Sequence, residues 1–204
     1  RVDIRGTGDS EGIIEDEYPK QEQDDALEII SWIENQAWSN GSVAMIGKSW
    51  GGFNGLQLAA LQPDALKTII TLCSTDDRYA DDVHYRGGTM MGSDMLWWAS
   101  TMFAYNARPP FPKFVGDKWY DMWLDRMENT PPFVEEWVSH QTRDDYWKHG
   151  SVCENYNDIK IPVLTMSGWA DGYTDALFRL MDNLNVPKKG IVGPWAHEFP
   201  DTAI

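Results

Sequence analysis

The sequence predicts an α/β protein built on a mostly parallel β-sheet, with a mostly helical segment inserted between two of its strands. Short apolar runs alternate with helical patterns in both halves of the chain. One apolar run, at 42–46, passes directly into the glycine-rich turn GKSWGG. The alternation stops between about residues 76 and 151. We therefore expect a first core segment over 1–75, a helical cap over 76–151 and a second core segment over 152–204.

The first core segment opens on residues 2–4 (VDI), which look like the end of a strand, followed by the glycine-punctuated loop RGTGDSEG. A helix is expected over 21–38 because its apolar residues share one face: Ala26, Ile30, Ile33 and Ala37. A strand over 42–46 and a second helix then follow. That helix begins after Ser49 and stops before Pro63, and another buried strand is expected at 67–72.

The remaining elements follow the same logic. Residues 76–151 contain no clear strand but carry Trp-, Met- and Pro-rich stretches such as MLWWASTMFAY. Strand patterns resume at 162–166 (PVLTM) and 189–192 (KGIV), with a helix between them around 174–184. The insertion therefore leaves the sheet after one strand and returns before the next, where it could fold over the strands' carboxyl ends.

Ser49 is the candidate nucleophile, because Gly47–Gly51 matches the pattern G-x-S-x-G between an expected strand and an expected helix. A nucleophile on this sharp turn stands above the sheet, so Gly47 and Gly51 are expected to keep side chains out of the way. The Trp50 backbone N–H is expected to serve as one oxyanion-hole donor. The alternative is a strand-to-helix turn that merely needs glycines.

Two later loops supply an acid and a base in the order that this chemistry requires. Asp171 follows the strand at 162–166, and His197 follows the strand at 189–192. Asp175 is a rival acid, but its place at the start of a helix explains its charge. The other histidines lie within the insertion and precede the acid: His84, His140 and His149.

These motifs together resemble the α/β-hydrolases of the cocaine esterase and X-Pro dipeptidyl-peptidase family. The matching pieces are RGTGDSEG, GKSWGG, GWADG and GPWAH, and they run from end to end of the chain. The resemblance implies Ser49 as nucleophile, Asp171 as acid and His197 as base, with a helical cap. It also implies an upstream tyrosine as second oxyanion donor and a C-terminal jelly-roll domain, so we expect the chain to be a fragment of a longer protein.

Substrate selectivity is expected from the cap and from the acid loop. Trp97 and Trp98 lie in the most apolar part of the insertion, and adjacent helical positions suggest that at most one lines a pocket. Tyr173, two residues after the acid, is another expected wall. Asp82 belongs to an acidic group that could bind a substrate ammonium, although a solvated acidic loop is the simpler interpretation; its other members are Asp76, Asp77 and Asp81.

Composition limits the partners. With 17 Lys+Arg against 32 Asp+Glu, the chain lacks the basic stripe needed to bind nucleic acid, and no run of apolar residues is long enough to span a membrane. Cys73 and Cys153 lack metal-ligand spacing and are expected to be buried, reduced thiols. We expect no metal and no cofactor, a small ester, amide or short peptide as substrate, and leave a homo-oligomer open. A cytoplasmic location is the expectation, without a sequence signal for it.

The sequence thus predicts a serine hydrolase that cleaves ester or amide bonds of bulky acyl substrates through an acyl-enzyme intermediate. An X-Pro dipeptidyl-peptidase is the second hypothesis. A non-catalytic binding or scaffold fragment is the third.

Overall fold

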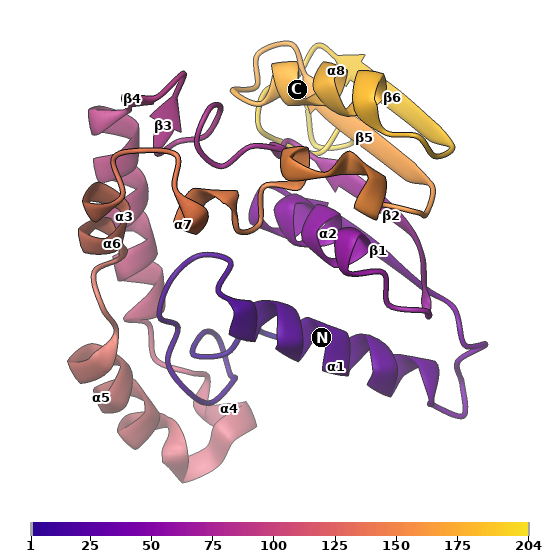
Figure 1. Cartoon of the computed structure of the whole chain (residues 1–204). Coiled ribbons are helices and arrows are strands. Elements are labelled where there is room, and N and C mark those ends of the chain that lie inside the picture. Colours follow the sequence, from indigo (N-terminus) through magenta and orange to yellow (C-terminus); the bar gives the residue numbers. More distant parts are fainter. Residues whose placement is uncertain (1, 204) are drawn as a thin grey trace.

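The computed structural model describes residues 2–203 and contains a four-stranded sheet in which every neighbouring pair is parallel. Its order is β1 (Val43–Lys48), β2 (Leu66–Leu72), β5 (Val163–Gly168) and β6 (Lys188–Gly193). All four strands lie within two residues of the expected positions. Because the strands are parallel, the loops that follow them meet at one edge of the sheet (Figure 1).

Three helices belong to the sheet half of the molecule: α1 (Lys20–Glu34), α2 (Trp50–Leu61) and α8 (Thr174–Asn183). The connections β1–α2–β2 and β5–α8–β6 advance across the sheet in the same direction. With right-handed crossovers, α2 and α8 therefore cover the same face (Figure 1). The opposite face is less covered, since Ile46 is 66% exposed and Ile191 is 43% exposed.

The main core lies between this sheet and its helices. Strand residues Val43, Ile69 and Val163 point inward and pack against Leu56 of α2 and Leu180 of α8. Burying such side chains supplies about 1.5–3 kcal/mol each relative to exposure, which accounts for the strand–helix pattern that the sequence shows. The helix expected over 21–38 ends earlier than predicted, at Glu34, and Ala37 is exposed beyond it.

The insertion is mostly helical, as expected. Its helices are α3 (Gly92–Asn106), α4 (Pro112–Val115), α5 (Trp119–Asn129), α6 (Phe133–Ser139) and α7 (Asp145–Lys148), with a 3₁₀ turn at Gly116–Lys118. Two further 3₁₀ turns, Val152–Glu154 and Tyr156–Asp158, open the second core segment. The expectation that it holds no strand is wrong, because β3 (Tyr85–Arg86) pairs antiparallel with β4 (Thr89–Met90). These strands are too short to show a period-2 pattern. Gly87 and Gly88, both at positive φ, form the turn between them.

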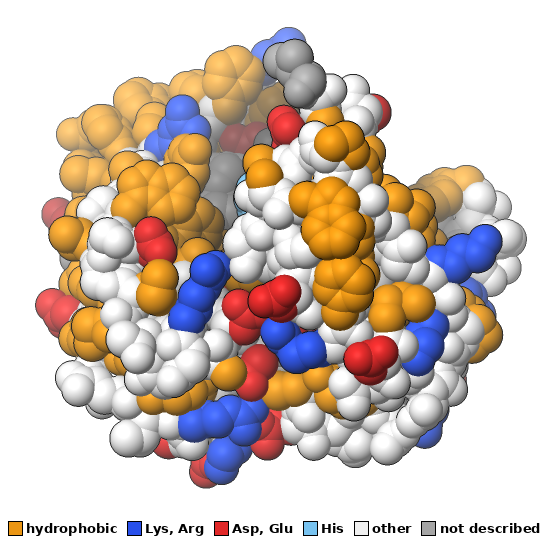
Figure 2. All heavy atoms as spheres, turned by 90° about the horizontal axis from the view of Figure 1, so that it is seen from above, with side chains coloured by type: hydrophobic (Ala, Val, Ile, Leu, Met, Phe, Trp, Pro, Cys, Tyr) orange, Lys and Arg blue, Asp and Glu red, His pale blue; other side chains and the backbone are white. Residues whose placement is uncertain are grey.

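A second, aromatic-rich core holds the insertion together, with Trp137 and Trp147 fully buried against Tyr85. Trp50 and Trp98 are partly buried against this core, whereas other tryptophans are exposed: Trp32, Trp38, Trp97 and Trp169. The outer surface of the insertion is also apolar, and Figure 2 shows hydrophobic side chains gathered on that side of the molecule. Trp97, Phe103 and Phe114 are among its exposed residues.

Buried Arg126 of α5 ties the insertion to the glycine-punctuated loop. Its guanidinium donates hydrogen bonds to the carbonyl oxygens of Gly8 at 3.0 Å, Ser10 at 2.7 Å and Arg108 at 3.1 Å. In the same loop, the Asp9 carboxylate accepts a hydrogen bond from the Phe111 N–H at 2.7 Å. The RGTGDSEG motif therefore has a structural role as the attachment point of the insertion.

Residues 2–4 do not form the expected strand. Their polar groups turn back into the following loop, since Thr7 N–H donates to the Ile4 carbonyl and the Ser10 hydroxyl donates to the Asp3 carbonyl. A strand requires a hydrogen-bonding neighbour, and in the described sheet β1 pairs only with β2. No helix within residues 2–203 is both long and apolar enough to cross a membrane.

Candidate active site

Ser49 occupies a strained turn between β1 and α2. Its φ of 55° and ψ of −124° lie in a region that residues other than glycine rarely adopt. The turn is held by the Ser49 N–H, which donates to the Leu72 carbonyl at 2.8 Å, and by the Ser49 carbonyl, which accepts from the Gly52 and Phe53 N–H groups. The strand, sharp turn and helix expected around a nucleophile are therefore present.

The glycines around Ser49 are needed to different degrees. A Cβ on Gly47 would lie 2.2 Å from the Gly51 backbone, so no side chain fits there. A Cβ on Gly52 would lie 2.8 Å from the Thr71 hydroxyl, so α2 packs closely against β2 at this position. A Cβ on Gly51 would meet nothing within 4 Å, so the expectation that Gly51 itself excludes a side chain is wrong. At Gly55 the neighbouring contact is an ordinary 3.9 Å.

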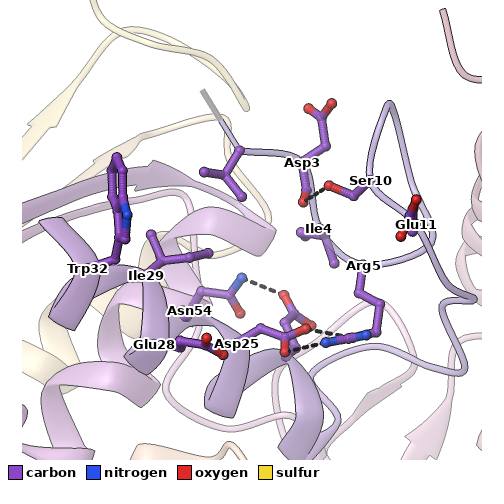
Figure 3. Close-up of a pocket in the computed structure, with 13 residues that line it drawn as sticks. Asp3, Ile4, Arg5, Ser10, Glu11, Asp25, Glu28, Ile29, Trp32 and Asn54 are labelled. Atoms are coloured by element: carbon purple, nitrogen blue, oxygen red, sulfur yellow. Dashed lines mark hydrogen bonds and ion pairs between the residues drawn. The ribbon is translucent and has the colours of Figure 1, made fainter. Parts of the chain in front are cut away.

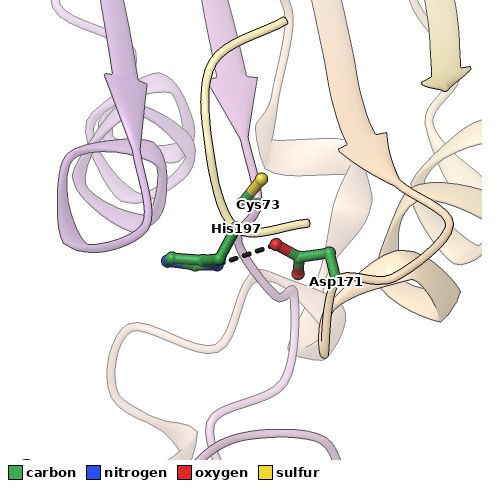
Figure 4. A group of neighbouring side chains, drawn as sticks. All are labelled: Cys73, Asp171 and His197. Atoms are coloured by element: carbon green, nitrogen blue, oxygen red, sulfur yellow. Dashed lines mark hydrogen bonds and ion pairs between the residues drawn. The ribbon is translucent and has the colours of Figure 1, made fainter. Parts of the chain in front are cut away.

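Asp171 and His197 form a hydrogen-bonded pair across two loops. His197 Nδ1 lies 2.7 Å from Asp171 Oδ2 (Figure 4). Asp171 Oδ1 accepts a hydrogen bond from the Tyr173 N–H at 2.6 Å. Burial alone would raise the pKa of Asp171. The hydrogen bonds from His197 and Tyr173 outweigh it and hold the pKa below its usual value. The carboxylate therefore stays ionised and fixes the orientation of the imidazole.

Sequence reasoning missed a third neighbour of this pair, Cys73, which follows β2. The ligand atoms of Cys73, Asp171 and His197 all lie within 4.8 Å of one another (Figure 4). Burial, followed by the nearby Asp171 carboxylate, raises the pKa of the Cys73 thiol to about 12. No motif marks Cys73, and its place directly after the strand expected at 67–72 is the one signal that could have pointed to this contact. Cys153, by contrast, is only partly buried, which corrects the expectation for that thiol.

The structure does not join Ser49 to His197 directly. Within residues 2–203 the Ser49 hydroxyl makes no hydrogen bond, and the His197 side chain is 42% exposed. The two residues are linked through their neighbours, since the Lys48 ammonium donates to the His197 carbonyl at 3.3 Å. Serine–histidine bonds are often long in unliganded hydrolases.

A small cavity of about 70 Å³ lies beside Ser49. Its walls come from the segment before α1, the Ser49 turn with α2, the insertion, and the loop that carries Asp171. The lining residues are Glu17, Tyr18, Ser49, Phe53, Asp82, Val83, His84, Trp97, Trp98 and Tyr173. All four predicted substrate-binding side chains thus lie on it. The expectation that at most one tryptophan lines the pocket is wrong. The Trp98 indole points inward to donate to Glu17, and Trp97 lies next to it, with ring centroids 6.0 Å apart.

Three residues of the cavity wall, Glu17, Asp82 and His84, form a buried charge cluster. His84 Nε2 lies 2.9 Å from a Glu17 oxygen, and Nδ1 lies 3.1 Å from an Asp82 oxygen. The Tyr173 hydroxyl donates to the other Asp82 oxygen at 2.7 Å. Burial lowers the pKa of His84, but the two carboxylates outweigh it and raise that pKa to about 9. His84 is therefore an imidazolium at neutral pH.

These contacts change the role expected of the acidic group. Both Asp82 oxygens are already bonded, so a substrate ammonium would compete with His84 and Tyr173 for this carboxylate. The other members are also paired: Asp76 and Asp81 each lie 2.7 Å from Arg179, and Asp77 lies 3.2 Å from Arg143. Asp76 and Asp81 anchor the insertion to α8 of the second core segment, and Asp77 binds the loop that precedes α7.

Glu22 of α1 is a second residue that the sequence did not single out. Its carboxylate accepts from the Trp50 indole N–H at 2.7 Å, from Asn54 at 2.6 Å and from the Tyr18 N–H at 3.1 Å. Burial raises the pKa of Glu22 to about 7, although these hydrogen bonds oppose the shift. By fixing the Trp50 side chain, Glu22 orients the start of α2, whose first N–H makes no hydrogen bond within the described chain.

A larger cavity of about 510 Å³ lies between residues 2–11 and α1 (Figure 3). Arg5 and Asp25 form an ion pair of 2.7 Å on its wall. It contains neither Ser49 nor the Asp171–His197 pair, so the reactive groups rather than cavity size identify the site.

The fold and this arrangement define the class of protein: an α/β-hydrolase, with the elbow serine after one strand and an acid–histidine pair after two others. More specifically, residues 1–198 match the model of the X-Pro dipeptidyl-peptidase (S15) family. The chain therefore belongs to this family of serine hydrolases.

Individual relatives agree. The chain is 27% identical over 219 residues to cocaine esterase of Rhodococcus sp. (strain MB1 Bresler), with 96% of this chain and 38% of the esterase covered. A CocE/NonD family hydrolase from Staphylococcus aureus superposes with a TM-score of 0.71 at 25% identity, over 93% of this chain and 31% of that one. An α-amino acid ester hydrolase shares the fold, with a TM-score of 0.62 at 20% identity, over 96% of this chain and 36% of that one.

Proposed function

We propose that this chain carries the catalytic triad of a serine hydrolase that cleaves esters or amides of bulky acyl groups. The single observation that supports this most strongly is the Asp171–His197 hydrogen bond at the same sheet edge as the strained Ser49 turn. Ser49 follows β1, Asp171 follows β5 and His197 follows β6, so the parallel sheet brings all three to one edge. The chain spans 38% of its cocaine esterase relative, so this proposal concerns the triad-bearing part.

In the proposed mechanism, Ser49 attacks the substrate carbonyl carbon while His197 Nε2 takes the hydroxyl proton. Asp171 keeps the proton on Nδ1 and stabilises the imidazolium that forms. The Trp50 N–H donates to the developing oxyanion, and removing one such donor typically costs about 10²–10³ in rate. His197 then returns the proton to the leaving group, and water activated by the same imidazole hydrolyses the acyl-enzyme.

The cavity of about 70 Å³ next to Ser49 can hold only part of a bulky acyl group, and Trp97, Trp98 and Tyr173 offer that part an aromatic wall. A second candidate, an X-Pro dipeptidyl-peptidase, is favoured by the Glu17–Asp82–His84 cluster. Glu17 and Asp82 place two acidic side chains on the cavity wall, where they would attract a peptide's amino terminus. Comparing turnover of a dipeptidyl-proline anilide with that of a simple aryl ester separates these two activities.

A fluorophosphonate probe tests the proposed nucleophile, because it reacts with serines activated by a neighbouring base. We expect mass spectrometry to locate the label on Ser49, and S49A to remain unlabelled. S42A is the matched control, since Ser42 lies just before β1 and should not affect labelling. Labelling of S49A at the wild-type level, or a correctly folded wild-type chain that does not react, would refute the triad and favour a non-catalytic role.

A further inference from the structure

Cys73 lies where it can convert the acid–histidine pair into a metal site. Cys73, Asp171 and His197 come from the loops after β2, β5 and β6, three neighbouring strands of the sheet. Their sulfur, oxygen and nitrogen atoms lie within 4.8 Å of one another (Figure 4). Thiolate, carboxylate and imidazole together are a donor set that suits Zn²⁺ and other thiophilic divalent cations.

The distances require only small movements. Zinc binds sulfur at about 2.3 Å, nitrogen at about 2.0–2.1 Å and oxygen at about 2.0–2.2 Å, so tetrahedral ligands stand about 3.4–3.6 Å apart. Asp171 Oδ2 and His197 Nδ1, now 2.7 Å apart, would separate by about 0.7 Å, and the Cys73 sulfur, which lies within 4.8 Å of both, would approach them by up to about 1.3 Å. The His197 side chain is 42% exposed, which gives the cation a path from solvent and leaves a fourth position for water.

Metal binding at this position is incompatible with base catalysis. In the acid–histidine pair, the Nδ1–H group donates a hydrogen bond to Asp171, and Nε2 is free to accept the serine proton. A cation bound to Nδ1 takes the lone pair that would carry that proton, so the neutral imidazole keeps its proton on Nε2. The thiol releases one proton as the S–H bond is replaced by the metal–sulfur bond, and no electron transfer is involved.

We propose that Cys73, Asp171 and His197 form an inhibitory site for a thiophilic divalent cation, with Zn²⁺ as the representative ion. The inhibitory part rests on the proposed hydrolase function, whereas the binding part does not. Cys73 is the residue that makes the site selective, because an acid–histidine pair alone offers two ligands without a thiolate.

Cobalt binding tests the site without reference to activity. Co²⁺ added to the purified wild-type chain should produce the near-ultraviolet charge-transfer absorption of a cobalt–thiolate bond, with one equivalent bound and displaced by Zn²⁺. C73S should lose this absorption and bind Zn²⁺ at least ten-fold more weakly. C153S is the matched control, because Cys153 is the other free thiol and is not part of the cluster. Circular dichroism establishes that each variant is folded, and C73A replaces C73S if the serine does not fold.

Fluorophosphonate labelling then tests inhibition. Zn²⁺ should slow labelling of Ser49 at least ten-fold in the wild type and in C153S, a chelator should restore it, and C73S should label equally with and without Zn²⁺. Cobalt absorption that persists in C73S overturns the site. Absorption that depends on Cys73 while labelling ignores Zn²⁺ overturns the inhibition. If the wild type shows the cobalt band with Co²⁺ but is not labelled in the absence of metal, the proposed hydrolase function is refuted and the metal site is still supported.

Discussion

Replacing His84 with glutamine should remove a pH-dependent part of the protein's stability. In the native state the imidazolium is 1% exposed and lies between Glu17 and Asp82, which raise its pKa from 6.5 to about 9. A raised histidine pKa stabilises the fold fully below the unfolded pKa of 6.5. The contribution is lost as the pH rises through about 9, because the native state then also releases the proton.

The size of this contribution follows from the shift. A change from 6.5 to about 9 is about 2.5 pKa units, and each unit corresponds to about 1.36 kcal/mol, so the contribution is about 3 kcal/mol. Burial raises the pKa of Glu22 from 4.5 to about 7, so the unfolding free energy falls as the pH rises through this range. That contribution is present in both proteins and cancels in their difference.

The assay is urea unfolding of the wild type and H84Q at several pH values between 6 and 10. The difference in unfolding free energy should be largest near pH 6 and shrink by about 3 kcal/mol by pH 10. H140Q is the control: His140 also has carboxylate neighbours that raise its pKa, but it is solvent-accessible and should change stability by less than about 1 kcal/mol. A wild-type minus H84Q difference that does not vary with pH would refute the buried imidazolium.

Three further substitutions test the packing around the site. G47A should abolish labelling at Ser49 and destabilise the fold, because its Cβ would overlap the Gly51 backbone, whereas G51A should be tolerated; thermal unfolding and labelling of the pair measure this. R126M should cost about 2–4 kcal/mol in urea unfolding because three part-buried carbonyl oxygens lose a charged donor, while R143M, which is more exposed, should cost less than about 1 kcal/mol. Y173F should cost about 1–3 kcal/mol, since the buried Asp82 carboxylate loses a donor; an unchanged unfolding free energy would contradict the observed bond.

The parts of the fold that the sequence predicts are those encoded by local patterns. Apolar runs identify β1, β2, β5 and β6, and helical periodicity identifies α1, α2 and α8, because burial on one face imposes each period. The loops that carry Asp171 and His197 could be located because parallel strands bring their carboxyl ends together. The Asp171–His197 bond then follows from topology and residue type.

The rest depends on contacts between segments far apart in the chain. Cys73 and Glu22 look like an ordinary buried thiol and a helix-start acid, and only the folded structure places them against the acid–histidine pair and Trp50. Asp82 was expected to face a substrate, but His84 and Tyr173 compete for the same oxygens. Pairing of this kind has no fixed spacing in sequence, so residue type alone could not distinguish a binding carboxylate from a structural one.

The sheet with helices on one face has a consequence for handling the protein. Parallel sheets are normally covered on both faces, yet Ile46 and Ile191 remain exposed in the described chain, and β1 presents an unpaired edge beside Ile46. The molecule therefore has one apolar, solvent-exposed face, through which copies can associate. In purification we therefore expect light scattering to rise with concentration and to fall when I46K places a charge on that face. The surface that limits solubility would then lie on the very strand from which the nucleophile elbow extends.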